Sequence, residues 1–230
     1  FFMTLGSFLI AFIPLQKILK INYKGKVEIP KKEILNYSIP AFLAVLFLIS
    51  FISADVILVK HFFNSKDAGF YAGLSLIGKD IFYFTAPIPM VMFPLLIKRH
   101  TMGQSYKKLF YLALILVTLP SLAISLVYFT FPDFIIKLFL GGREYLILSQ
   151  YLGIFALYLT IFSLVNVCVG FFLSFNETKI APLVILAAVL QIILIYFFHE
   201  NFYQIIQVSI IVSFGLFISL LTYYFKKFKL

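Results

Sequence analysis

The chain alternates long apolar runs with short polar stretches. Runs without any charged residue cover residues 34–54, 109–132, 145–176, 180–198 and 201–225. A helix needs about 20 consecutive apolar residues to cross a bilayer, so each run predicts a transmembrane helix. Residues 1–16 and 68–97 are two further candidates, and neither they nor the other runs show the period-two alternation of a membrane β-barrel. The pattern predicts an all-α, polytopic transmembrane bundle of about seven spans.

The span within residues 68–97 carries an unusual number of prolines. Its ~28 residues would extend about 42 Å as one helix, which exceeds the ~30 Å hydrocarbon core. Pro87, Pro89 and Pro94 each remove a backbone donor. Such breaks persist in a membrane only where neighbouring helices or a water-filled cavity satisfy the freed carbonyls. We therefore predict a bent or broken helix beside a cavity.

Composition and charge agree with a membrane protein. Hydrophobic residues make up 63% of the 230 residues, and the formal net charge is +10. The basic residues are segregated: fourteen lie in one set of alternating polar stretches, including the C-terminus, against four in the other set. By the positive-inside rule the richer set faces the cytoplasm, where it also meets anionic headgroups. No aromatic and basic patch suggests nucleic-acid binding.

The stretch from residue 18 to residue 36 is the longest polar segment, and it is the one candidate boundary between two lobes. Residues 1–17 read as a span that begins abruptly at Phe1 and lacks the basic start of a signal peptide. Because the end of that span is predicted to be cytoplasmic, Phe1 faces outward. We expect further helices to precede it.

Ionisable residues inside spans are costly, at roughly 2.5–3.5 kcal/mol each, and by default they mark a pathway. Asp55, Lys79 and Asp80 are the candidates. On antiparallel neighbouring helices, Asp55 lies about 7 Å and Lys79 about 15 Å below the outer end, within reach of the flexible lysine stem. The pair would either lock two helices together or offer a cation to an anionic substrate. Asp80 points about 100° away from Lys79.

Other polar residues carry weaker expectations. Arg143, next to Glu144 at an outer end, belongs either to a solvated rim or to a contact with an entering phosphate. Asn166 and Gln191 either hold helices together or line a cavity. Cys168 is the single cysteine, and the three histidines are dispersed, so we expect no metal and no cofactor. Catalytic motifs and large outer loops are missing from the sequence, which argues against an enzyme.

The segment "DVILVKHFFNSKDAGFYAGLSLIGKDIFYFTAPIPMVMFPLL", with Asp55, the "DAGFYA" turn and Phe93-Pro94, resembles the polysaccharide-biosynthesis (oligosaccharide flippase) branch of the multidrug/oligosaccharidyl-lipid/polysaccharide exporter superfamily. "FIIKLFLGGREYLILSQYLGIF" is a weaker similarity. The resemblance implies two pseudosymmetric, MATE-like lobes around a cavity. It assigns residues 1–17 to the last helix of a truncated N-terminal lobe, 18–36 to the inter-lobe linker, and 37–230 to a C-terminal six-helix lobe.

The implied activity is flipping of a polyprenyl-diphosphate-linked oligosaccharide across the cytoplasmic membrane for polysaccharide or lipopolysaccharide biosynthesis. The substrate-binding candidates are Lys79, Asp55, Asp80 and Arg143, with Lys79 as the phosphate contact. The implied partners are the bilayer, the lipid-linked oligosaccharide and the missing N-terminal lobe. A cation-coupled multidrug exporter and a non-transporting scaffold of a polysaccharide assembly complex remain as alternatives, followed by a membrane-embedded glycan polymerase or ligase.

Overall fold

The computed structural model describes residues 31–228. The predicted span at 1–16 therefore lies outside the described residues, as does most of the predicted linker at 18–36. The chain divides into two units, residues 1–35 and 36–230. The second unit contains all the helices that surround the candidate residues, and it is described by itself below.

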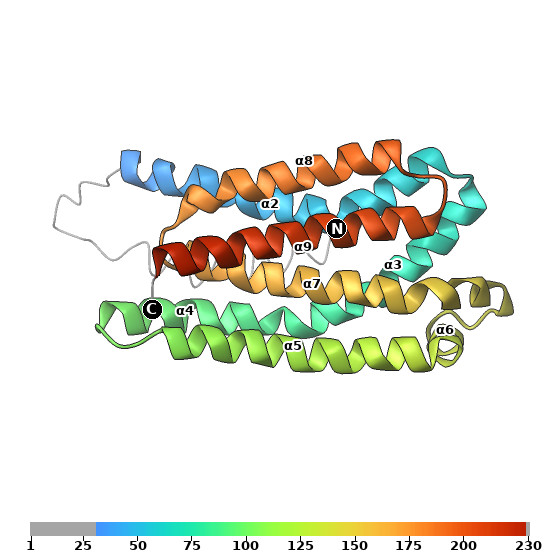
Figure 1. The fold of residues 1–230 in the computed structure, drawn as a ribbon, viewed down its shortest axis with the longest axis horizontal. Coiled ribbons are helices and arrows are strands. Elements are labelled where there is room, and N and C mark those ends of the chain that lie inside the picture. Colours follow the sequence, from blue (N-terminus) through green and yellow to red (C-terminus); the bar gives the residue numbers. More distant parts are fainter. Residues whose placement is uncertain (1–30, 229–230) are drawn as a thin grey trace, which may run out of the picture. The chain divides into compact units, whose positions relative to one another are not determined.

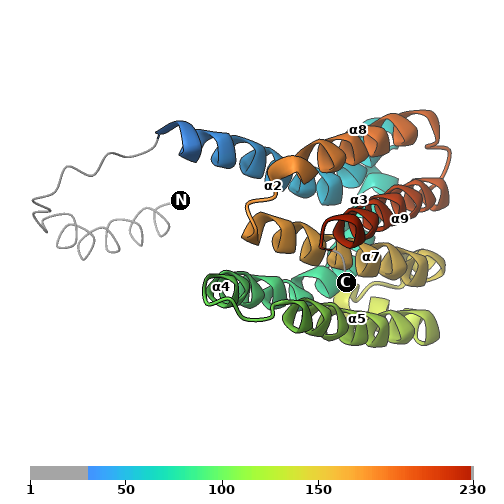
Figure 2. The ribbon, with the colours of Figure 1, turned by 60° about the vertical axis from the view of Figure 1, so that its left-hand side comes forward.

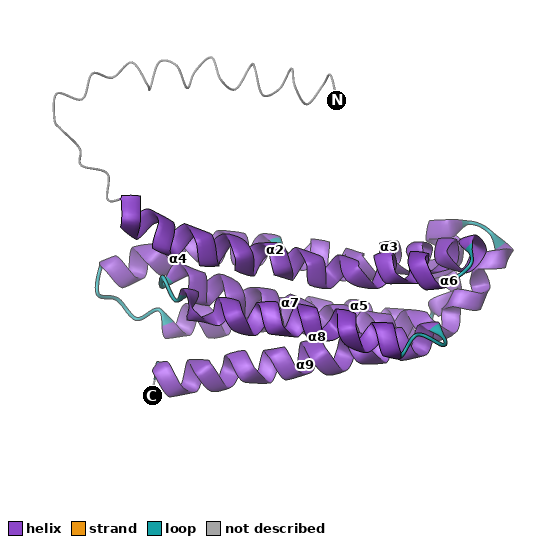
Figure 3. Ribbon diagram, turned by 90° about the horizontal axis from the view of Figure 1, so that it is seen from above, coloured by secondary structure: helices purple, strands orange, loops and turns teal. Residues whose placement is uncertain are grey.

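The described residues form helices and connecting loops, without a strand among them (Figure 3). In chain order the elements are α2 (Lys31–Phe62), α3 (Ser65–Thr85), α4 (Pro87–Thr101), α5 (Lys107–Thr130), α6 (Pro132–Leu140), η1 (Arg143–Leu148), α7 (Ser149–Ser174), η2 (Thr178–Ile180), α8 (Ala181–Phe197) and α9 (Phe202–Lys227). Within this part of the chain, six segments are long and apolar enough to cross a membrane. This confirms the predicted all-α polytopic bundle.

The predicted break in the proline-bearing span is confirmed. α3 ends at Thr85, Ala86 links the two halves, and α4 starts at Pro87. Pro87 and Pro89 fall in the first turn of α4, where a missing N–H costs little because it has no partner within the helix. Pro94 lies inside α4 without ending it. Of the three prolines, Pro87 is the one at the break between α3 and α4.

α7 is the central helix of the second unit (Figures 1 and 2). It packs against α3, α4, α5 and α9, and most of its side chains are buried. α3 lies so close to α7 at Gly78 that a Cβ placed there would overlap the ring of Phe155. α5 is connected by a hydrogen bond between the hydroxyls of Ser125 and Thr160, 2.9 Å apart. α7 therefore supplies the common wall against which the outer helices are placed.

Short polar sequences define the turns between spans. The Asn64 side chain caps α3 by accepting from the backbone N–H groups of Lys66 and Asp67, as N-cap asparagines do. α6 is a short amphipathic helix that ends at Gly141, whose φ of 71° is the left-handed conformation that glycine adopts without strain. η1 leads from Gly142 into α7.

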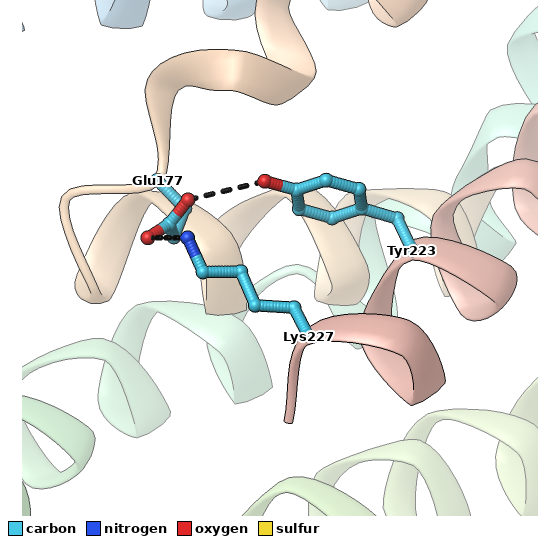
Figure 4. A network of polar contacts seen from close by, with 3 residues as sticks. All are labelled: Glu177, Tyr223 and Lys227. Carbon is cyan, nitrogen blue, oxygen red and sulfur yellow. Dashed lines mark hydrogen bonds and ion pairs between the residues drawn. The ribbon is translucent and has the colours of Figure 1, made fainter. Parts of the chain in front are cut away.

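At one end of the bundle, α4, α7 and α9 end while α5 and α8 begin; we call it the basic end (Figure 1). Here the carboxylate of Glu177, in the turn after α7, forms an ion pair with Lys227 and accepts a hydrogen bond from the Tyr223 hydroxyl (Figure 4). Rings from α5, α7 and α9 pack beside this network, including Phe110, Phe171 and Tyr224. These contacts hold the ends of α7 and α9 together.

Candidate functional site

A cleft of about 560 Å³ opens between α2, the α3–α4 break and α7, and we call it the central cleft. Its lining is almost wholly apolar and includes Leu48, Ile52, Phe82, Met90, Phe93 and Phe162. Met90 is 72% exposed, so the cleft is open at the surface of the described unit. The predicted cavity beside the proline break is therefore present, and its walls suit an apolar chain.

Asn166 is the one amide in the lining of the central cleft. It lies on α7 one turn from Phe162 and from Gly170, which also line the cleft. In the part of the chain that the structure describes, its side chain makes no hydrogen bond. A partly buried amide without a partner favours a ligand that supplies one, since unsatisfied polar groups are costly in an apolar site.

Lys79 and Asp55 lie one helical turn beyond the cleft, on the side away from the basic end. Lys79 precedes the lining residues Phe82 and Tyr83 by three and four positions, so all three share a face of α3. Asp55 follows the lining residue Ile52 by three positions on α2. The apolar cleft is therefore continued by a half-buried cation and a buried carboxylate.

The partner of Asp55 differs from the one expected. Its carboxylate, fully buried, accepts a 3.0 Å hydrogen bond from the Tyr71 hydroxyl on α3 and a 2.8 Å bond from the Val56 N–H. Lys79 is close enough to interact with it electrostatically, but no ion pair joins the two among the described residues. Asp55 thus holds α2 to α3 through Tyr71. Lys79 is half-buried and forms no ion pair with a carboxylate of residues 31–228.

The other two predicted site residues lie elsewhere. Asp80 interacts electrostatically with Tyr128 of α5, whose hydroxyl donates to the Ile77 carbonyl at 3.2 Å. Asp80 and Lys79 therefore interact with different neighbours, as their positions on the helix predict. Arg143 is exposed at the start of η1. The structure brings Asp55 and Lys79 close to the cleft, and it brings neither Asp80 nor Arg143 into its lining.

One contact of this site escaped sequence reasoning. Tyr71 is one of 14 tyrosines, and nothing in its local sequence singles it out as the partner of Asp55. Gln191 was expected to hold helices together or line a cavity; its amide donates to the Ser209 hydroxyl at 3.0 Å and connects α8 to α9. Its Oε1 is buried without a hydrogen-bond partner among the described residues. No cluster of possible metal ligands occurs in residues 31–228.

The fold and the cleft define a multi-pass membrane protein whose helices surround an apolar cleft. Comparison with protein-family models, with curated proteins and with solved structures finds no match to this chain.

Proposed function

We propose that this chain forms one lobe of a transporter that flips a polyprenyl-diphosphate-linked oligosaccharide across the cytoplasmic membrane by alternating access. One observation carries the proposal: the apolar central cleft continues, one turn further along α3, into the half-buried cation of Lys79. A prenyl diphosphate has the same order of parts, an apolar chain followed by a strongly anionic group. Ammonium and phosphate groups form charge-assisted hydrogen bonds, which are the strong ones.

In this proposal each residue of the site has a separate task. The cleft walls hold part of the prenyl chain, the Asn166 amide binds a polar group of the substrate, and Lys79 binds the diphosphate. Asp55 is the counter-ion that lowers the cost of a cation inside the membrane while Tyr71 holds it in place. A second lobe supplies the opposite wall, and rocking of the two lobes exposes the cleft to either side. The basic end faces the cytoplasm.

The test is binding of undecaprenyl diphosphate to the purified chain in nanodiscs, for the unchanged chain and for Lys79→Ala. Hydrogen bonds to charged groups contribute about 1.5–3 kcal/mol, so we expect affinity to fall by about 10- to 100-fold. Lys60→Ala is the matched control, because Lys60 is an exposed lysine towards the end of α2. It should change affinity by less than about twofold. Equal affinities for Lys79→Ala and the unchanged chain would refute the proposal.

The same variants connect binding to transport. In cells that depend on the protein for export of a lipid-linked oligosaccharide, Lys79→Ala should abolish export while the protein remains in the membrane. Unchanged export would contradict the assignment of Lys79. A scaffold subunit needs neither the central cleft nor the Lys79 cation. Its function would therefore survive both a variant that fills the cleft and the Lys79→Ala variant.

A second candidate is a cation-coupled multidrug exporter, and the burial of Asp55 favours it. Asp55 has no ion-pair partner within residues 31–228, and unpaired carboxylates inside a membrane are typical of proton and cation pathways. In that case Asp55→Asn should stop transport of a labelled cationic dye, and Lys79→Ala should not. The flippase proposal instead expects Lys79→Ala to weaken binding of the prenyl diphosphate more than Asp55→Asn does.

A further inference from the structure

A second hollow lies on the other side of α4, between α4 and α5, and we call it the lateral groove. Its volume is about 360 Å³, and every residue that lines it is apolar, including Val91 and Leu95 of α4 and Leu109, Leu112 and Leu116 of α5. Val91 is 63% exposed and Leu112 49% exposed, so the groove is open. It shares no lining residue with the central cleft.

The lateral groove runs towards the basic end and stops at a cluster of cations. Lys98 and Arg99 follow Leu95 by three and four positions on α4, and Lys108 precedes Leu112 by four on α5. Residues at these spacings lie on one helix face, so the cations are placed at the mouth of the groove. Lys107 begins α5 beside them. Arg99 also donates to the Ser105 carbonyl at 3.3 Å, within the loop that connects the two helices.

The two helices that form this mouth contribute no acidic side chain to it. Residues 81–132 contain no aspartate or glutamate, although they include both α4 and α5. Glu177 at the same end of the bundle is engaged by Lys227 and Tyr223 (Figure 4). The N-terminus of α5 adds the partial positive charge of its helix dipole. The groove thus ends in a concentration of positive charge at the level where α4 ends and α5 begins.

We propose that the lateral groove binds an anionic phospholipid of the surrounding bilayer, with an acyl chain between α4 and α5 and the phosphate at Lys98, Arg99 and Lys108. From Leu95 to Pro87 the groove follows α4 for about 12 Å. This is less than half of the ~30 Å hydrocarbon core, so one leaflet supplies the ligand. Basic residues between transmembrane helices bind anionic headgroups in this way. The site does not depend on the transport proposal.

The chain contains no tryptophan, so a single introduced tryptophan reports the lipid beside it. Leu112→Trp places the reporter in the lateral groove, and Leu186→Trp places it on α8. Both are sixth residues of their helices at the basic end, 49% and 63% exposed, so their depths are matched. The full chain is reconstituted in vesicles of phosphatidylcholine and phosphatidylglycerol in which one lipid is brominated, and quenching of the tryptophan gives the relative affinity of the two lipids.

At Leu112→Trp we expect phosphatidylglycerol to be preferred by about 25-fold or more, since each basic residue near the surface contributes about fivefold and more than one lies at this mouth. At Leu186→Trp the preference should stay at about fivefold or below, because only Lys179 lies nearby in sequence. Adding Lys98→Gln and Lys108→Gln to Leu112→Trp should reduce the preference to about fivefold or less, because two of the cations are lost. Lys179→Gln with Lys226→Gln removes two other exposed cations of the basic end. This double variant should leave the lipid preference at Leu112→Trp unchanged.

Leu116→Trp, one turn deeper in the groove, gives the same measurement if Leu112→Trp does not fold. Equal preferences at the α5 and α8 reporters would overturn the site. A preference for phosphatidylglycerol that survives the loss of Lys98 and Lys108 would also overturn it. The same holds if the Lys98/Lys108 and Lys179/Lys226 double variants reduce the preference equally. Absence of quenching by either brominated lipid at both α5 reporters would show that something other than lipid occupies the groove, and would also refute the proposal.

Discussion

The two halves of the broken span differ in how they are packed. α3 buries residues on several of its turns, among them Tyr71, Ile77 and Gly78, and it lies tightly against α7. α4 buries only Pro89, Met92 and Leu96, and it has a hollow on each side. The break at Ala86 therefore separates an anchored half from a half whose surroundings are unfilled. One apolar segment thus contains both a tightly packed wall and a half with a hollow on each side.

The two hollows beside α4 also differ from each other. The central cleft contains the Asn166 amide and continues towards Lys79 and Asp55. The lateral groove has no polar lining residue and ends at exposed cations. An apolar hollow inside a bilayer has lipid as its ordinary occupant, so its shape alone indicates little. The polar groups at its border decide which amphiphile it prefers, and where the headgroup lies.

The largest effect should come from α3. Gly78→Leu places a side chain where the Phe155 ring lies, and such overpacking costs about 3 kcal/mol or more because α3 and α7 must separate. Cys168 is the only cysteine and is buried, so a thiol-reactive dye reports unfolding. The apparent Tm should fall by about 10 °C. Gly69→Leu on the same helix is the control: a Cβ there meets no atom, and Tm should not fall.

A smaller effect, on binding rather than stability, should follow when the central cleft is filled. A Cβ at Gly170 meets only Pro89, at 3.8 Å, so Gly170→Phe extends into open space. Its ring displaces about four methylene groups of a bound chain at about 0.8 kcal/mol each, which weakens binding of undecaprenyl diphosphate by about 200-fold. Gly215→Phe, at an exposed position of α9, is the control. Equal affinities for both variants would place the substrate outside the cleft.

Next in size is the contribution of the Asn166 amide. Asn166→Leu keeps a side chain of similar length but removes the one amide of the cleft lining. A hydrogen bond contributes about 0.5–1.5 kcal/mol, so affinity for the prenyl diphosphate should fall by about tenfold at most. Gln207→Leu, which removes an exposed amide of α9, should have no effect. Tighter binding by Asn166→Leu would show that the cleft holds only the apolar part of the ligand.

The sequence predicts the architecture of the described unit well and the site only in part. Charge-free runs locate five of the six described spans and the apolar stretch 68–97 locates the sixth, because a bilayer imposes length and polarity on each helix independently of its neighbours. The prolines likewise locate the break near residue 86 and the hollow beside it. Partners across helices depend instead on rotation and depth. The sequence suggested Lys79 as the partner of Asp55. In the structure Asp55 instead accepts a hydrogen bond from Tyr71, which the turn capped by Asn64 places opposite it.

The smallest effect should come from adding the same ring on the other side of α4. Val91 is 63% exposed and lines the lateral groove, so a larger side chain there has room. Val91→Phe replaces one apolar contact by another, so Tm should stay within about 2 °C and affinity for the prenyl diphosphate within about twofold. Binding and the dye-reported Tm are measured on the same preparations as for Gly170→Phe. A loss of affinity as large as that of Gly170→Phe would mean that the substrate occupies both sides of α4, and that the two hollows are parts of one pathway.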